Sequence, residues 1–189
     1  MKTGFIKTST AFLLAAALTL PAFADEPRAA PELAINMPDG SQELLSSFKG
    51  KPVMLSFFFT TCPHCQDMSR LLSSQIVPEY APKGVQFLAA AFDDNAKEQV
   101  GDFNAKYVHG FTVGWVERGS VYEFLQKSIV VPLYVPILVF IDRKGIIQSE
   151  YVGDPVFLKD PPHNVRAELD KLLAKPVLTT KAATHLTKK

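Results

Sequence analysis

The sequence predicts an α/β fold in which a central mixed sheet carries helices on both faces. Short, continuous apolar runs at residues 53–59 and 85–92 are typical of strands that are buried on both sides. Each run is followed by apolar residues at helical spacing, and residues 137–152 are typical of a β-hairpin that precedes a last helix. This order of elements indicates a single layered domain.

The first 24 residues predict a secretory signal peptide. Lys2 and Lys7 form a basic start, residues 11–20 are apolar, and Ala22-Phe23-Ala24 offers a cleavage site of the small-x-small kind. The alternative is an uncleaved membrane anchor, although the apolar run is shorter than the roughly 20 residues that a spanning helix needs. Export by this route indicates a bacterial periplasm, where disulfides persist.

The rest of the chain divides into a domain and a tail. We expect one domain over residues 25–175 and a disordered tail over residues 176–189, which are rich in Thr, Lys and Ala and lack apolar spacing. The formal net charge is +1 and becomes −1 once the signal peptide is removed. A nearly neutral chain without a basic stripe argues against nucleic acid as a partner.

In the first half, a short strand is expected at residues 33–37 and a brief helical segment at residues 42–48. The buried strand 53–59 follows. Apolar positions 65, 68, 72 and 76 then have a period near 3.6, so a helix should follow that strand, and Pro78 should end or kink it.

In the second half, strand 85–92 precedes a helix that extends to about residue 107, with Asp93, Asp94 or Asn95 as its N-cap. We expect an edge strand at residues 111–116 and a helix at residues 121–129. The hairpin 137–152 and a final helix that begins at Asp160-Pro161-Pro162 complete the domain.

The chain has only two cysteines, Cys62 and Cys65, and they lie where a buried strand meets a helix. Side chains three residues apart on a helix have Cβ atoms about 5–6 Å apart, so small adjustments bring the two sulfurs into bonding range. The helix N-terminus favours a thiolate. We therefore predict that Cys62 is the exposed attacking thiol and that Cys65, on the apolar face, is the buried resolving thiol.

The two intervening residues fit this chemistry. Pro63 suits the first turn of a helix, where the amide that proline lacks would be unpaired. The imidazole of His64 can stabilise the Cys62 thiolate by a hydrogen bond or by positive charge, which makes the disulfide more oxidising. We assign catalytic roles to Cys62, Pro63, His64 and Cys65.

Two other readings of the cysteine pair are weaker. A structural disulfide that encloses two residues would constrain the unfolded chain little, and a structural zinc site needs four ligands, usually from a second pair. A copper(I) chaperone that binds metal through the two thiolates, with a histidine added, stays open. The leading hypothesis requires no cofactor and no metal.

The motif Cys62-Pro63-His64-Cys65 after an aromatic strand, with Tyr134-Val135-Pro136-Ile137 downstream, resembles the thioredoxin superfamily. This resemblance implies a thioredoxin-like fold with a cis-proline at Pro136, next to the dithiol. It also implies that the Val135 backbone pairs with an incoming peptide. We assign substrate contacts to Thr61, Val135 and Pro136 on this basis.

Two features are similar to the TlpA-like branch of exported thiol-disulfide oxidoreductases. One is the front end, with Met37-Pro38-Asp39-Gly40 and Phe48-Lys49-Gly50-Lys51-Pro52, which indicates a short N-terminal β extension. The other is the long stretch between Cys62 and Pro136, which leaves room for an inserted strand and helix before the cis-proline. The branch implies protein thiols as substrates and a membrane-embedded electron partner.

The chain departs from this pattern in three places. Thr61 occupies the usual position of a tryptophan, and Ser56 occupies that of a buried acid on the central strand. The dipeptide Pro63-His64 is that of the DsbA-type oxidants, whereas the branch consists of reductases. The direction of electron flow therefore stays open, as does the oligomeric state.

A thiol peroxidase of the peroxiredoxin kind is a less favoured alternative. That family places a proline and a threonine or serine at fixed distances before its reactive cysteine, and this chain has Leu55 and Phe59 there. A copper chaperone of the Sco type would have three residues between its cysteines, whereas this chain has two.

Overall fold

A computed structural model describes residues 27–174; the predicted signal peptide and the predicted tail lie outside the described residues. Its strands form one mixed sheet in the order β1-β8-β7-β4-β5-β6-β2-β3. The strands are β1 (Arg28–Ala29), β2 (Ala34–Asn36), β3 (Gln42–Leu44), β4 (Val53–Phe58), β5 (Gln86–Ala91), β6 (Thr112–Trp115), β7 (Ile137–Ile141) and β8 (Ile146–Val152).

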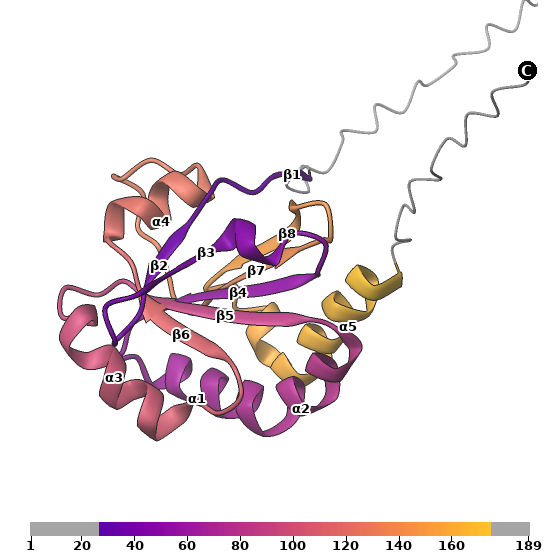
Figure 1. The fold of residues 1–189 in the computed structure, drawn as a ribbon, viewed down its shortest axis with the longest axis horizontal. Coiled ribbons are helices and arrows are strands. Elements are labelled where there is room, and N and C mark those ends of the chain that lie inside the picture. The colour runs from indigo at the N-terminus through magenta and orange to yellow at the C-terminus, as the bar shows by residue number, and fades with distance from the viewer. Residues whose placement is uncertain (1–26, 175–189) are drawn as a thin grey trace, which may run out of the picture.

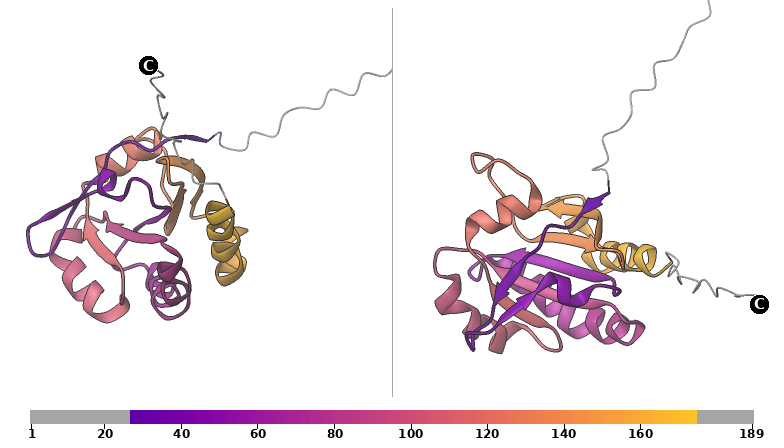
Figure 2. Two further views of the ribbon diagram at one scale, coloured as in Figure 1. Left: turned by 45° about the vertical axis from the view of Figure 1, so that its right-hand side comes forward. Right: turned by 45° about the horizontal axis from the view of Figure 1, so that its top comes forward.

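Helices cover both faces of this sheet, as predicted. Figure 1 shows α1, α2 and α3 below the sheet and α4 above it, and the turned views in Figure 2 show α5 packed beside α2. The α-helices are α1 (Pro63–Leu71), α2 (Val77–Tyr80), α3 (Ala96–Tyr107), α4 (Arg118–Leu125) and α5 (Pro161–Ala174).

Strand β4 is the centre of the domain. It pairs in parallel with β5 and antiparallel with β7, and all of its six residues are buried. Because side chains alternate across a strand, Leu55 and Phe57 pack on the α4 side while Met54 and Phe58 pack on the side of α1, α3 and α5. Burial on both faces explains why this segment is apolar except at Ser56.

The prediction that residues 111–116 form an edge strand is wrong. Strand β6 lies between β5 and β2, and the hairpin of β2 and β3 extends the sheet beyond it. Gly114 allows this close approach, because a Cβ atom there would lie 2.3 Å from the backbone oxygen of Asn36. Pairing between residues so distant in the chain leaves no local sequence pattern.

The prediction of a helical segment at residues 42–48 is half correct. Gln42–Leu44 is strand β3, which pairs antiparallel with β2, and only Leu45–Phe48 forms a 3-10 turn. The apolar residues at positions 44, 45 and 48 suit a helical turn, but hydrogen bonds to β2 extend the first three residues of the segment.

Pro78 does not end the first long helix. The chain passes from α1 through a π-helical turn at Leu72–Ile76 into α2, and Pro78 lies in the first turn of α2. Pro78 has no N–H group to donate, and the wider π-helical turn before it adjusts the hydrogen-bond pattern of the helix to that loss. Further along, α4 ends at Leu125, earlier than predicted, because Gln126 takes a left-handed conformation with φ of 54°.

The inserted elements lie where the resemblance implied. Strand β6 and helix α4 occupy the stretch between α3 and β7, before Pro136. Among residues 27–174, no helix combines the length and the apolar composition needed to cross a bilayer.

Candidate active site

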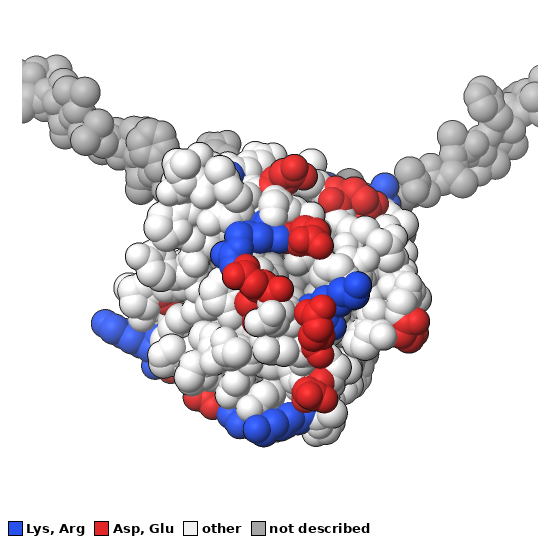
Figure 3. Space-filling view, turned by 90° about the vertical axis from the view of Figure 1, so that its left-hand side faces the viewer, with Lys and Arg blue, Asp and Glu red and all other residues white. Residues whose placement is uncertain are grey.

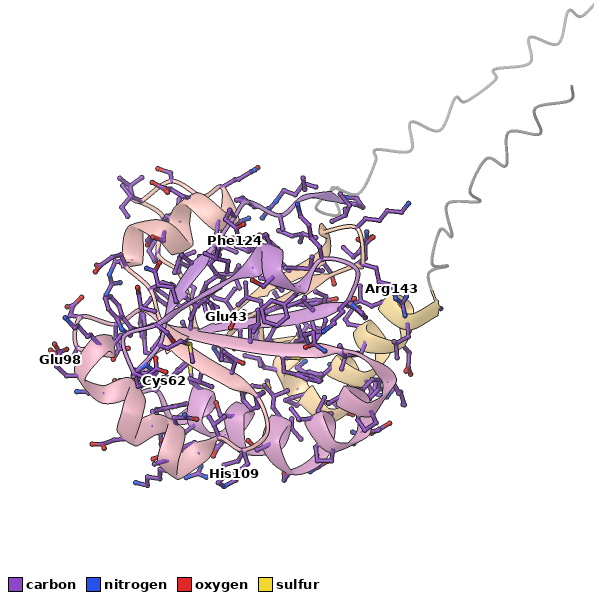
Figure 4. All side chains as sticks on the ribbon, viewed as in Figure 1. Glu43, Cys62, Glu98, His109, Phe124 and Arg143 are labelled. Atoms are coloured by element: carbon purple, nitrogen blue, oxygen red, sulfur yellow. The ribbon has the colours of Figure 1, made fainter. Side chains whose placement is uncertain are left out.

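Cys62 lies at the junction of β4 and α1, where the sequence predicted it. It is the N-cap of α1, and its carbonyl accepts the backbone N–H groups of Cys65 and Gln66, each at 3.1 Å. Pro63 occupies the first turn, as expected for a residue without an N–H group. Figure 4 shows Cys62 at the end of the sheet opposite Arg143 and near the end of α3 that carries Glu98.

The two cysteines differ in exposure. Cys62 is half-buried, whereas Cys65 is 1% exposed and packs among residues that include Phe58, Ala91 and Phe103. They are 3.0 Å apart. Burial raises the pKa of the Cys65 thiol, and the hydrogen bond with Cys62 raises it further. Cys65 therefore stays protonated in the reduced protein while Cys62 meets solvent.

The side chains of Thr61, Pro63 and His64 are exposed around the dithiol. His64 also lines a cavity of about 290 Å³ whose other walls are largely apolar. Those walls are formed by the outer side of α1 and by the segment before and at the start of α5: Asp67, Met68, Leu71, Leu158, Pro161 and Pro162.

The peptide bond between Val135 and Pro136 is cis, as the resemblance implied. Val135 is partly buried and packs against the apolar cluster of Cys65, against which Cys62 also packs. The carbonyl of Pro136 accepts the backbone N–H of Gly153 at 3.1 Å, which ties the start of β7 to the end of β8. Val135 and Cys62 therefore contact the same apolar cluster, and the cis-proline directly follows Val135.

Ser56 is 5% exposed and has a position on β4 between Met54 and Phe58, so the central strand brings no carboxylate toward Cys65. An acid that acts on the Cys65 thiol is instead Asp93, which the sequence predicts only as a helix cap. Asn95 is the N-cap of α3, and the Asp93 carboxylate instead accepts two hydrogen bonds from Thr60. The sequence signal for this contact is that Thr60 and Asp93 each directly follow an apolar run, because parallel pairing of two such strands brings their ends together.

Metal-ligating residues do not gather within residues 27–174: no group of three or more His, Cys, Asp and Glu side chains there could hold a metal ion. His64 therefore does not join the two cysteines in such a set. On the face that is at the left of Figure 1, acidic and basic side chains are intermixed (Figure 3).

Known proteins are similar to this chain in sequence and in fold. The model of the AhpC/TSA family matches residues 27–150. The thiol-disulfide oxidoreductase ResA of Bacillus thuringiensis is 30% identical over 125 residues, which are 66% of this chain and 68% of that protein. The thioredoxin-like protein YneN of Bacillus subtilis is 29% identical over 133 residues, which are 68% of this chain and 72% of that protein.

A solved structure agrees with these relatives. The crystal structure of a putative thiol:disulfide interchange protein DsbE from Chlorobium tepidum superposes with a TM-score of 0.62 and 25% identity, over 77% of this chain and 99% of that chain. The dithiol at a strand-to-helix junction, the fold and the relatives all indicate a thiol-disulfide oxidoreductase. The chain therefore belongs to the AhpC/TSA family and is a TlpA-like thiol-disulfide oxidoreductase of the thioredoxin superfamily.

Proposed function

We propose that the protein works in the periplasm and exchanges electrons with protein thiols through Cys62 and Cys65. One observation carries this proposal: a half-buried Cys62 begins α1 directly beside a buried Cys65. The free N–H groups of a helix start favour an anionic sulfur, which is the reactive form in exchange. A buried partner thiol is protected from attack by other molecules.

In the reducing direction, the Cys62 thiolate attacks a disulfide of the substrate. A Cys62–substrate disulfide forms, and the other substrate sulfur leaves as a thiolate. Cys65 then loses its proton and attacks the sulfur of Cys62, which releases the second substrate thiolate and forms the Cys62–Cys65 disulfide. The substrate gains two electrons and the dithiol loses two. Run backwards, the same steps oxidise a substrate dithiol.

The surface around Cys62 suits an extended polypeptide. We assign to Val135 and Pro136 the backbone groups that would pair with a substrate, because Val135 packs against the apolar cluster of Cys65. The exposed side chain of Thr61 lies directly before Cys62. A backbone segment can pair there in the manner of a strand. The cavity beside His64 could take an apolar side chain of the same substrate.

The compartment and the electron partner follow from the sequence and the resemblance. The signal peptide predicted at residues 1–24 would export the chain to a place where disulfides persist. A dithiol that reduces protein disulfides must receive two electrons for each turnover. A membrane-embedded electron partner would supply them, as the TlpA-like branch implies.

The redox potential of the cysteine pair tests this function and its direction. Equilibration with glutathione buffers, read by mass after thiol alkylation, should show one two-electron transition. A potential near about −270 mV indicates a reductase, and one near about −120 mV indicates an oxidant. Two independent thiols, or a pair that never closes, would contradict the proposal.

The His64→Pro variant tests the role of the dipeptide. Loss of the imidazole should destabilise the Cys62 thiolate and make the pair more reducing, by on the order of 30 mV for each 1.4 kcal/mol of lost stabilisation. His64→Gln is the matched control, because it removes the imidazole without a second proline in the helix start. An unchanged potential in both variants would remove His64 from the mechanism.

Anaerobic titration of the reduced protein with copper(I) separates the copper-chaperone alternative. We expect no stoichiometric complex that depends on both cysteines. Tight binding that is lost on replacement of either Cys62 or Cys65 would favour the chaperone instead.

A further inference from the structure

The reaction requires the buried thiol of Cys65 to lose a proton before it can attack the mixed disulfide. Only the thiolate is nucleophilic, and Cys65 is 1% exposed. The central strand offers no base, because Ser56 stands where an acid would face α1. The proton must therefore pass to a group outside β4.

Asp93 is placed to receive it. It directly follows the buried Phe92, the first residue after β5, and β5 is the parallel neighbour of β4. The N–H of Phe92 donates to the carbonyl of Phe58 at 3.1 Å. Asp93, the next residue, therefore lies beside the segment that leads from β4 to Cys62. The backbone N–H of Phe59 hydrogen-bonds to Cys65, and the next N–H, that of Thr60, donates to Asp93 Oδ1 at 3.2 Å.

The hydrogen bonds of Thr60 show where a proton can be held. Thr60 is 6% exposed, and its Oγ1 lies 2.5 Å from Asp93 Oδ2 and 2.6 Å from Gln99 Oε1. A hydroxyl has one proton to donate, yet it faces two acceptor oxygens. One arrangement that makes both contacts hydrogen bonds has a proton on Asp93, which donates to Thr60 Oγ1, while Thr60 donates to Gln99 Oε1.

The same three side chains also suit an ionised Asp93. The Thr60 hydroxyl then donates to the carboxylate, and the Gln99 amide turns over so that its NH₂ group donates to Thr60 Oγ1. The contacts of Thr60 therefore persist with or without a proton on Asp93. Such a cluster can gain and release a proton without repacking the core.

Asp93 also reaches solvent. It lines a cavity of about 360 Å³ between the start of α3 and the start of α4, at the end of the sheet where Figure 4 shows Cys62 and Glu98. A proton held on Asp93 can leave through this cavity. The charged groups that share the cavity with Asp93 are Asp94, which pairs with Arg118 at 3.0 Å, and Lys97, Glu98, Glu117 and Arg118.

We propose that Asp93, with Thr60 and Gln99, accepts the proton of Cys65 during the resolving step. Cys65 gives its proton to the cluster while its sulfur bonds to Cys62, the Cys62–substrate bond breaks, and the substrate leaves as a thiolate. The cluster then releases the proton to solvent. This inference rests on the exchange function proposed above and adds the residue that governs its second step.

Electrostatics give this proposal a test with two opposite outcomes. After burial and Cys62, the charge of Asp93 is a further cause that raises the pKa of the Cys65 thiol. If Asp93 acted through its charge alone, replacing it with asparagine would ease thiolate formation and speed the second step. If Asp93 accepts the proton, the same replacement slows that step.

The experiment follows the reaction of the reduced full chain with 5,5′-dithiobis(2-nitrobenzoate). Attack by Cys62 releases one coloured thiolate, and closure by Cys65 releases a second one. In Asp93→Asn, we expect an unchanged first phase and closure that is slower by at least about tenfold near neutral pH. The closure rate of the variant should then rise about tenfold per pH unit, in proportion to hydroxide, and approach that of the unchanged protein in alkali.

Two further variants make the result specific. Asp94→Asn removes a neighbouring carboxylate from the same cavity and should leave both phases unchanged. Thr60→Val removes the hydroxyl between Asp93 and Gln99 and should slow closure in the same direction as Asp93→Asn, which gives a second reading if one variant folds poorly. Equal or faster closure in Asp93→Asn, with an unchanged pH profile, would overturn the inference. Release of only one coloured thiolate by the unchanged protein would instead overturn the proposed function.

Discussion

Replacing Cys62 with serine should abolish turnover of a disulfide substrate, lowering its rate by at least about a thousandfold because no other described residue can form the mixed disulfide. Cys65 cannot substitute for Cys62. It is 1% exposed, and burial raises the pKa of its thiol, so it is both shielded and protonated. Reduction of glutathione disulfide, coupled to an external reductant, measures the loss.

Alkylation rates separate the two thiols without a substrate. In Cys65→Ser, the remaining Cys62 should react with iodoacetamide at the rate of an accessible thiol. In Cys62→Ser, the remaining Cys65 should react at least about tenfold more slowly until the protein is unfolded. Equal rates in the two folded variants would show that the sites do not differ as the structure indicates.

Replacing Phe57 with alanine should lower the free energy of unfolding by about 3–5 kcal/mol. Phe57 is fully buried in β4, and its ring packs edge-on against Phe124 and Phe92, with centroid distances of 5.5 and 6.4 Å. Removing it leaves a cavity between the central strand and α4. Urea unfolding followed by circular dichroism gives the change in free energy.

Phe59→Ala is the matched control for this prediction. Phe59 is two residues further along and only partly buried, although its ring also contacts Phe92 at 4.6 Å. We expect a cost of about 1–2 kcal/mol, because less apolar surface is removed from the core. A larger cost for Phe59 than for Phe57 would contradict the assignment of the core around β4.

Local patterns made part of this structure predictable. A short, almost wholly apolar run is typical of a strand buried on both faces, and the predicted strand 53–59 agrees with β4 to within one residue. Pro63 at the first helical position and apolar residues at a period of 3.6 located α1. The dithiol was therefore placed correctly at the helix start, with Cys65 buried beneath it.

Contacts between distant segments were not predictable. The place of β6 inside the sheet depends on its pairing with β2, and strand β3 forms only because β2 lies beside it. Thr60 and Asp93 each follow a strand, but only the parallel register of β4 and β5 brings the two together. Asp93 consequently looked like a helix cap.

Trapping the mixed disulfide tests the central claim most directly. The Cys65→Ala variant, incubated with a disulfide-bonded protein, should accumulate a covalent adduct through Cys62, because no second thiol can release the substrate. The adduct should be visible by mass without reductant, vanish on reduction, and be absent when Cys62 is also replaced. Failure of Cys65→Ala to form an adduct with any disulfide or thiol substrate would contradict exchange through this pair.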